Sequence, residues 1–187
     1  KSNEKAACTS FAQVQAASGK VQADGQTFDA AVFAVAPYHL APLLPGHLGD
    51  AVRQAVQQLS YHAITTVYLR YPQPLHLPAA LTGFAHRPTQ WLLDRGRLQH
   101  PNEAAAIIST SDLVAESSLH TDGKPDWAAT AHQDLLQLNP HLPPPEAQQT
   151  ITEKRATVAS TVNRRLPDMA DLNAARIWLA GDWLHER

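Results

Sequence analysis

The sequence predicts an α/β fold with α+β character, in which short buried strands near both ends of the chain frame a mixed insertion. Residues 28–36 form a nearly continuous apolar run closed by Pro37, and residues 176–180 form a second short apolar run. Such runs are typical of strands buried on both faces of a sheet. Between them, β-branched strand patterns alternate with helical patterns. A chain that leaves a sheet and returns to it is common in two-domain enzymes with a cleft between the halves.

Composition fits a folded protein and excludes several classes. The 187 residues include 17 acidic and 15 basic side chains, with 44% hydrophobic and 17% charged residues. A disordered chain would carry fewer apolar and more charged groups. A net charge of -2 argues against a nucleic-acid-binding domain, which needs a basic face. The one cysteine, Cys8, excludes a disulfide within the chain and favours a reducing compartment.

The first part of the chain is expected to form short strands joined by tight turns. Residues 14–24 alternate loosely, and Gly19-Lys20 and Asp24-Gly25 are turn signals. The buried strand 28–36 follows, and the proline-containing stretch 37–45 leaves this layer. An apolar stripe at helical spacing then predicts an amphipathic helix over residues 50–60.

The middle of the chain is predicted to be rich in strands. The strand candidates are residues 63–71, a hairpin formed by 81–84 and 90–94 with a turn at 95–97, and residues 104–110. Asp126 is a candidate N-cap for a helix with an apolar stripe that starts at Trp127. Residues 149–158 alternate between apolar and polar side chains and predict a half-exposed strand.

Familiar catalytic and metal-binding motifs are missing. The ten histidines include no His-x-His or His-x-x-x-His pair, so their spacing does not predict a metal site. The sequence also lacks a Gly-x-Ser-x-Gly elbow and a Gly-x-Gly-x-x-Gly loop. No catalytic residue is therefore assigned. No apolar run approaches the about 20 residues that cross a bilayer.

Several separated patches together resemble one family. Residues 28–37 (FDAAVFAVAP) resemble the D-A-V-V-x-A-x-P strand of the superfamily of FAD-dependent amine oxidases and phytoene desaturases. Residues 153–158 (EKRATV) and 177–183 (IWLAGDW) are similar to segments of its hydroxysqualene dehydroxylase branch, the squalene-associated FAD-dependent desaturases. Residues 64–69 and 90–96 are similar to the same branch in order and spacing. The resemblance covers nearly the whole chain.

The resemblance implies a fragment of a two-domain, amine-oxidase-like fold with FAD as cofactor. Residues 1–37 would belong to the FAD-binding domain, 38–148 to a mixed-sheet substrate domain, and 149–187 to strands that return to the FAD-binding domain. The implied activity is that of an FAD-dependent oxidoreductase acting on a long-chain isoprenoid, namely conversion of hydroxysqualene to squalene on the hopanoid route. The flavin would carry the hydride, and the protein would contribute orientation and a water-poor cavity.

The resemblance also implies cofactor-binding residues at the ends of the two apolar strands: Ala36, Pro37, Ala180, Gly181, Asp182 and Trp183. Gly181 and Asp182 would contact the ribityl-pyrophosphate region, and Trp183 would lie near the flavin. A glycine lets backbone approach a ligand closely because it has no Cβ, and the Asp182 carboxylate can accept hydrogen bonds from ribityl hydroxyls. Amides at the start of a following helix would favour the pyrophosphate.

Aromatic residues of the insertion are candidates to line a hydrocarbon tunnel, with ordinary core packing as the alternative for each. They are Tyr61, Tyr68, Tyr71, Phe84 and Trp91. Tyr68, Asp94 and Arg95 are polar candidates near such a pocket, where acid assistance would help a hydroxyl leave as water.

This sequence also departs from the family pattern. The glycine-rich dinucleotide loop that the family carries near its N-terminus is absent, and the chain stops where a helix is expected after the A-G-D-W motif. We therefore expect a C-terminal fragment that is inactive alone and binds FAD weakly or not at all.

Three alternatives remain open. A carotenoid-type desaturase or a flavin amine oxidase would share the FAD chemistry, and a non-catalytic interaction domain would not. For an enzyme of the hydroxysqualene dehydroxylase type, the expected partner is a hydrophobic isoprenoid substrate, with no nucleic acid. The expected location is the cytoplasm, with peripheral contact of the parent protein with the inner membrane.

Overall fold

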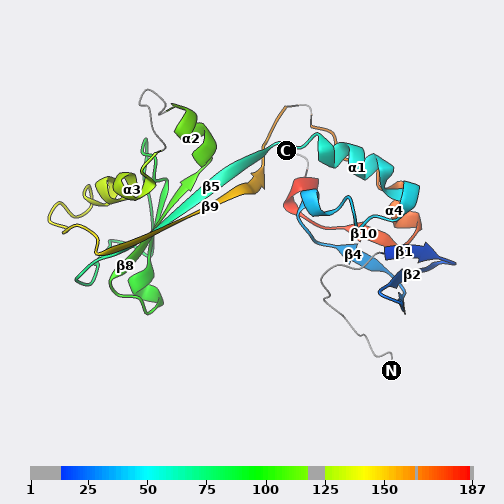
Figure 1. Ribbon diagram of the computed structural model, residues 1–187, viewed down its shortest axis with the longest axis horizontal. Helices are drawn as coiled ribbons and strands as arrows, with labels where there is room; N and C mark the ends of the chain where they lie inside the picture. The colour runs from blue at the N-terminus through cyan, green and yellow to red at the C-terminus, as the bar shows by residue number, and fades with distance from the viewer. Residues whose placement is uncertain (1–13, 118–124, 163, 186–187) are drawn as a thin grey trace. The chain divides into compact units, whose positions relative to one another are not determined.

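The computed structural model describes residues 14–117, 125–162 and 164–185, and the chain forms two compact units (Figure 1). Unit 1 combines Lys1–Leu59 with Ser160–Arg187, and unit 2 is Ser60–Ala159. The chain therefore leaves unit 1 once and returns to it after completing unit 2. Cys8 lies outside the described residues.

The unit boundaries differ from those expected from the sequence, which placed the insertion at 38–148. Residues 38–59 stay with unit 1, because the helix that follows the first apolar strand packs there. The strand over residues 147–158 belongs to unit 2, because it pairs along its length with the strand Tyr61–Arg70 of that unit. The functional roles given to these parts remain predictions.

Unit 1 begins with an antiparallel three-stranded meander of β1 (Val14–Ala17), β2 (Lys20–Ala23) and β3 (Gln26–Phe28). The two connections are tight turns in which Gly19 (φ 74°) and Gly25 (φ 75°) adopt left-handed backbone conformations. Glycine takes this conformation without steric cost. Both predicted turns are therefore confirmed.

A separate parallel pair joins the two ends of the described chain. β4 (Ala31–Phe33) pairs with β10 (Ile177–Leu179), and Val32 stands opposite Trp178. The expected strand over 28–36 is shorter, because Phe28 ends the meander and only three residues pair with β10. The expectation of burial on both faces is also wrong for Val32, which is 64% exposed.

Helices complete unit 1. α1 (Asp50–Gln57) confirms the predicted amphipathic helix, and its Val52 and Val56 are buried. The 3-10 helices η1 (Pro37–His39) and η2 (Gly46–Gly49) precede α1. α4 (Ala170–Ala174) leads into β10, and the 3-10 helix η4 (Asp182–Leu184) follows it.

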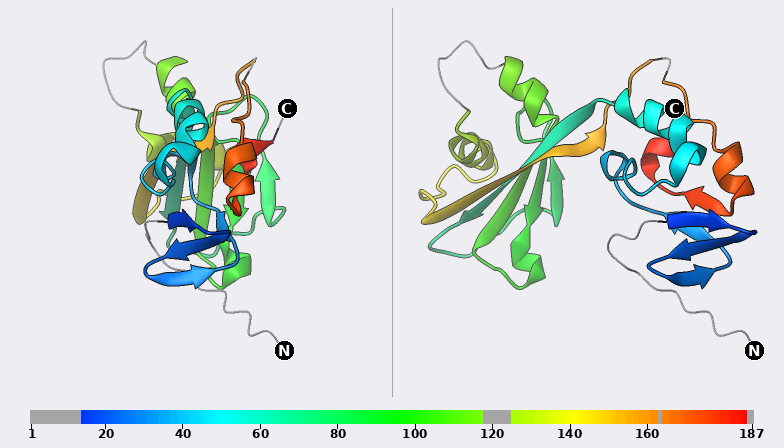
Figure 2. Two further views of the ribbon diagram at one scale, coloured as in Figure 1. Left: turned by 90° about the vertical axis from the view of Figure 1, so that its right-hand side faces the viewer. Right: turned by 45° about the vertical axis from the view of Figure 1, so that its right-hand side comes forward.

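Unit 2 is built on a five-stranded antiparallel sheet, ordered β6-β7-β8-β5-β9 (Figure 2). Its strands are β5 (Tyr61–Arg70), β6 (Leu81–Gly83), β7 (Trp91–Asp94), β8 (Glu103–Ser109) and β9 (Ala147–Val158). Each predicted strand of the insertion is confirmed, and the β6–β7 hairpin pairs as expected. The 3-10 helix η3 (Arg95–Leu98) forms where a turn was predicted.

One face of this sheet carries the core of unit 2. α3 (Trp127–Leu135) packs Ala128, Ala131 and Leu135 into a cluster with sheet residues such as Val67 and Ile108. The helix begins at the predicted cap, since the Asp126 carboxylate accepts hydrogen bonds from the N–H groups of residues 128 and 129. α2 (Ser111–Ser117), which the sequence did not predict, follows β8 and also contacts β5.

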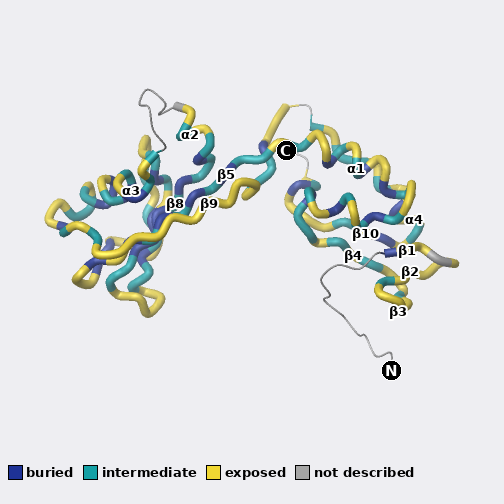
Figure 3. The backbone as a smooth tube through the Cα atoms, in the orientation of Figure 1, coloured by how far each residue is buried: buried dark blue, intermediate teal, exposed yellow. Residues whose placement is uncertain are grey.

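The edge strand β9 is more exposed than predicted. Its first ten residues are exposed on both faces, and the yellow tube in Figure 3 follows it over most of its length. The expected half-exposed pattern needs a covering layer on one face, and α3 lies mainly over the neighbouring strands. Among the described residues, no helix is long and apolar enough to cross a membrane, and no group of three or more His, Cys, Asp or Glu side chains could hold a metal ion.

Candidate functional site

The predicted cofactor residues lie where β4 and β10 end. Parallel strands present their carboxyl ends at the same edge, which is where ligands bind in open α/β sheets. The Ala180 N–H donates to the Phe33 carbonyl at 2.9 Å, so the two strands stay together up to this edge. After β4 the chain passes through Ala36 and Pro37 into η1, and after β10 it passes through Gly181 into η4. The structure thus brings both predicted segments to one edge of one sheet.

Side chains at this edge differ in exposure. Ala180, Gly181 and Asp182 are exposed, whereas Pro37 is buried as the first residue of η1. Proline suits this position because its fixed φ and missing N–H match the first turn of a helix. The Ala36 carbonyl already accepts the His39 N–H at 2.9 Å. The accessible polar groups at this edge therefore include the Asp182 carboxylate.

Gly181 is required by its neighbour Trp183. A Cβ added at Gly181 would lie 2.6 Å from Cδ1 and 2.7 Å from Nε1 of the Trp183 ring. The Gly181 backbone is extended (φ 163°), a conformation that any residue adopts. The glycine is thus needed for the close approach of the indole rather than for its dihedral angles.

Trp183 lies under this turn rather than on its surface. The side chain is only 4% exposed, and its Nε1 is buried without a hydrogen-bond partner among the described residues. An unpaired buried N–H is uncommon in folded proteins and costs free energy. The expected position of Trp183 beside a flavin stays a prediction, and its visible role here is packing against Gly181.

The polar candidates of the insertion lie on opposite faces of the unit 2 sheet. Tyr68 is half-buried on the face away from α3. The Arg95 guanidinium stacks on it, with Cζ 5.0 Å from the ring centroid. Asp94 is buried on the other face, and its carboxylate accepts the Gly96 N–H at 2.8 Å to cap η3. The role of Asp94 is therefore to cap η3. The sequence pattern did not distinguish this capping role from that of the polar pocket candidates Tyr68 and Arg95.

The predicted aromatic tunnel does not form as one group. Tyr71 is fully buried in the unit 2 core, where its hydroxyl hydrogen-bonds to His132 Nδ1 at 3.0 Å. Phe84 packs against the same core. Trp91 instead is 46% exposed on the face that carries Tyr68. Ordinary core packing, the alternative given from the sequence, is thus confirmed for Tyr71 and Phe84.

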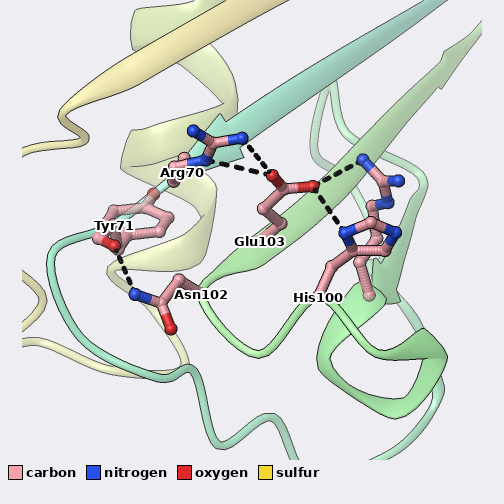
Figure 4. A network of polar contacts seen from close by, with 6 residues as sticks. Arg70, Tyr71, His100, Asn102 and Glu103 are labelled. Carbon is pink, nitrogen blue, oxygen red and sulfur yellow. Dashed lines mark hydrogen bonds and ion pairs between the residues drawn. The ribbon is translucent and has the colours of Figure 1, made fainter.

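A cluster that the sequence did not predict surrounds Glu103 (Figure 4). Arg70 Nε and Nη2 both donate to Glu103 Oε1, at 3.0 and 2.8 Å. Arg95 Nη1 donates to Glu103 Oε2 at 2.7 Å, and His100 Nδ1 lies 3.9 Å from the same oxygen. The hydrogen bonds from Arg70 and the neighbouring positive charges hold the pKa of Glu103 below its usual value, against the opposing effect of burial. We call these four residues the arginine cluster.

The arginine cluster lines an open groove of about 740 Å³ together with Tyr68 and part of β9. Register brings its members together, because Arg70 and Glu103 are direct partners across β5 and β8. The sequence pattern predicts both strands but not their register. With the register known, the oppositely charged side chains that face each other across the two antiparallel strands would have indicated this cluster.

Comparison with protein families gives one match. Residues 6–103, just over half of the chain, match the family described as flavin containing amine oxidoreductase. Comparison with curated proteins gives no significant match.

Solved structures share the fold. A putative protoporphyrinogen oxidase from Exiguobacterium sp. 255-15 superposes with a TM-score of 0.52 at 16% identity, covering 90% of this chain and 40% of that one. Wild-type putrescine oxidase bound to putrescine gives a TM-score of 0.54 at 18% identity, covering 86% and 39%. Reduced UDP-galactopyranose mutase gives 0.50 at 12% identity, covering 85% and 37%. The chain therefore spans about 40% of the length of the structures that it resembles.

Proposed function

The chain belongs to the flavin-containing amine oxidoreductase family, whose cofactor is FAD, and from this premise we propose that it forms the C-terminal part of an FAD-dependent oxidoreductase. The observation that carries the proposal is the parallel pairing of β4 with β10. This pairing joins two motifs that lie far apart in the sequence and that both resemble flavin-site segments. Two independent resemblances therefore meet at one sheet edge.

The residues at this edge fit one part of an FAD site. Asp182 is exposed beyond the carboxyl end of β10 and presents a carboxylate that can accept hydrogen bonds from ribityl hydroxyls. Gly181 is exposed and has no Cβ, so a ligand can approach its backbone closely. Bound FAD would supply hydride transfer, and these residues would hold and orient it.

The pyrophosphate part of such a site needs residues that this sequence does not contain. No Gly-x-Gly-x-x-Gly loop is present, and η4 is a single turn of three residues. Backbone N–H groups of a glycine-rich loop and a helix N-terminus are the usual means of holding a dinucleotide pyrophosphate. We therefore propose that this chain by itself binds FAD weakly and is inactive.

For the substrate, we propose a long-chain isoprenoid, with hydroxysqualene converted to squalene as the specific reaction. The support is the similarity of residues 153–158 and 177–183 to the hydroxysqualene dehydroxylase branch. A carotenoid-type desaturase, which also acts on a long-chain isoprenoid, is the alternative within this substrate class.

A flavin amine oxidase is the second candidate. The matched family carries amine oxidation in its description, and the fold is similar to that of putrescine oxidase. Both candidates use the same cofactor edge and differ in the substrate that reaches it.

The test uses the full-length protein that carries this chain. We expect flavin absorbance bands in the purified protein and conversion of hydroxysqualene to squalene when the flavin is reduced. Oxidation of amines such as putrescine, with no reaction of hydroxysqualene, would favour the flavin amine oxidase over the isoprenoid-converting enzyme. A protein that binds no flavin even with added FAD would refute the oxidoreductase proposal and favour an interaction domain.

Asp182→Asn tests the cofactor edge directly. We expect the dissociation constant for FAD to rise about tenfold, because charge-assisted hydrogen bonds are lost. Asp171→Asn is the matched control, since Asp171 is also an exposed carboxylate of unit 1 but lies on α4. Equal FAD affinity in the Asp182 variant and the control would remove Asp182 from the site.

A further inference from the structure

The unit 2 sheet has one covered face and one open face. Side chains alternate along β5, so Val67 and Leu69 point into the core beneath α3, while Tyr68 and Arg70 point to the other face. Among the described residues of unit 2, α2 and α3 contact β5 and the 3-10 helix η3 contacts β8, and the core that includes α3 lies on the Val67 side. We call the Tyr68 side the open face.

The end of the open face near Arg70 carries excess positive charge. Glu103 is the one acidic side chain among the described residues that line the groove, and both of its oxygens are already engaged by Arg70 and Arg95. Two guanidiniums and one carboxylate leave a net positive charge, and His100 adds to it when protonated. A ligand with negative charge would be attracted to this end.

The two guanidiniums are held in place and still have hydrogen-bond donors to offer. Glu103 is largely buried, with a side chain only 13% exposed, and it anchors both arginines. Arg95 is fixed further by stacking on Tyr68. Arginine has five N–H donors, and the Nη1 group of Arg70 and the Nε and Nη2 groups of Arg95 have no partner among the described residues. Fixed, planar donors of this kind match carboxylate and phosphate oxygens.

Beyond the charged end, the open face becomes apolar. Thr66 stands between Ile107 of β8 and Ile151 of β9, and Ile107 in turn stands opposite Trp91 of β7. Trp91 is 46% and Ile151 50% exposed, so this row presents large apolar surface to solvent. Arg70 and Thr66 lie four positions apart along β5, which corresponds to roughly 13 Å. Charge and apolar surface thus lie on one face, with Tyr68 between them.

We propose that the open face binds a small anionic amphiphile, with an oxyanion head group at Arg70 and Arg95 and an apolar body over Tyr68 and Ile107 toward Trp91. The head group is a carboxylate or a phosphate, since both offer oxygens at the spacing of a guanidinium. The apolar body gains by covering exposed aromatic and aliphatic surface. A cationic or uncharged head would lose this pairing.

The site lies wholly within unit 2 and uses none of the residues at the β4–β10 edge. It therefore does not depend on the proposed FAD chemistry, and its binding can be measured without flavin.

The first experiment compares ligands that differ in one part. Calorimetric titration of the purified chain uses octyl phosphate, octanoate, inorganic phosphate and octyltrimethylammonium. We expect saturable binding of octyl phosphate and octanoate, and at least about tenfold weaker binding of inorganic phosphate, which lacks the apolar body. Octyltrimethylammonium should not bind. Equal binding of the cationic ligand, equal binding of inorganic phosphate, or no saturation by octyl phosphate would each overturn the proposal.

The second experiment locates the site. Arg95→Gln removes one donor set and should weaken octyl phosphate binding at least about tenfold, whereas Arg95→Lys should retain part of the affinity. Lys154→Gln is the control, because Lys154 is an exposed cation of β9 that does not line the groove. Circular dichroism checks that each variant is folded. If the control loses as much affinity as Arg95→Gln, the site is elsewhere, and if Arg95→Gln does not fold, the ligand series on the unaltered chain decides alone.

Discussion

Trp178 of β10 stands directly opposite Val32 of β4 in a parallel pair, although the two residues come from opposite ends of the described chain. Both side chains are exposed, Val32 by 64% and Trp178 by 40%. Their neighbour Ile177 is fully buried on the other face. The β4–β10 strand pair therefore packs with only one face against the core of unit 1.

This one-sided burial predicts unequal effects of truncation along β10. Ile177→Ala should lower the free energy of unfolding by about 2 to 5 kcal/mol, because it opens a cavity. Trp178→Ala should cost about 1 kcal/mol, since much of the ring already contacts solvent. Urea denaturation followed by circular dichroism measures both. Val32→Ala serves as a second exposed control, and equal losses at all three positions would contradict one-sided burial.

Gly181 and Trp183 form a second testable pair. Gly181→Ala should destabilise the protein by about 1 to 3 kcal/mol, because its Cβ would overlap the Trp183 ring. Adding Trp183→Leu should relieve part of that overlap, so the double variant should lose less than the sum of the two single losses. Urea unfolding of all four proteins gives the coupling. Strict additivity would show that the two side chains do not compete for the same space.

The sequence allowed prediction of features set by local pattern. The tight turns at Gly19 and Gly25 and the N-cap at Asp126 follow from residue chemistry within a few positions. The two apolar runs that pair as β4 and β10 were also identified. Each of these depends on near neighbours in the chain or on composition alone.

Features that depend on distant partners were not predicted. The arginine cluster needs the register of β5 against β8, which places Arg70 opposite Glu103. The exposure of Val32 depends on what covers β4, and the unit boundary at Ser60 depends on where α1 packs. Periodicity specifies which residues share a face, but it does not specify what lies over that face.

Tyr71 offers a test of core burial at high pH. Burial raises the pKa of its hydroxyl well above the usual value of 10. The folded state therefore keeps the proton above pH 10 while the unfolded state loses it. The stability associated with this group is present below about pH 10 and is lost as pH rises further.

Absorbance titration of the tyrosines measures this effect. Tyr71→Phe should leave the amplitude of the folded protein's alkaline transition unchanged, because burial keeps the proton on this hydroxyl in the folded state. The Tyr71 variant should also lose about 1 kcal/mol at neutral pH with the hydrogen bond to His132. A smaller titration amplitude in the Tyr71 variant would show that this hydroxyl ionises in the folded state.

Asp112 lies at the start of α2 and links this helix to β5. This link predicts that the stability of the protein falls in acid. Its carboxylate accepts the Ala63 N–H at 2.9 Å and contacts His62 Nδ1 at 3.0 Å. Burial alone would raise the pKa of Asp112, but the hydrogen bonds from His62 and Ala63 outweigh it and lower the pKa. A lowered folded-state pKa means that the stabilisation is present above the ordinary pKa near 3.8 and is lost as pH falls through the folded-state value.

Asp112→Asn should therefore destabilise the protein at neutral pH and matter little in strong acid. The expected loss at pH 7 is about 1 kcal/mol, since the carboxylate is 34% exposed and solvent screens part of the interaction. Urea unfolding of the variant and the unaltered chain between about pH 7 and pH 3 should give curves that converge on acidification. Subtracting the two curves removes the contribution of Glu103, whose lowered pKa acts in the same direction in both proteins. A difference that stayed constant with pH would mean that the Asp112 charge does not hold α2 against β5, because only an ionised carboxylate gives a pH-dependent term.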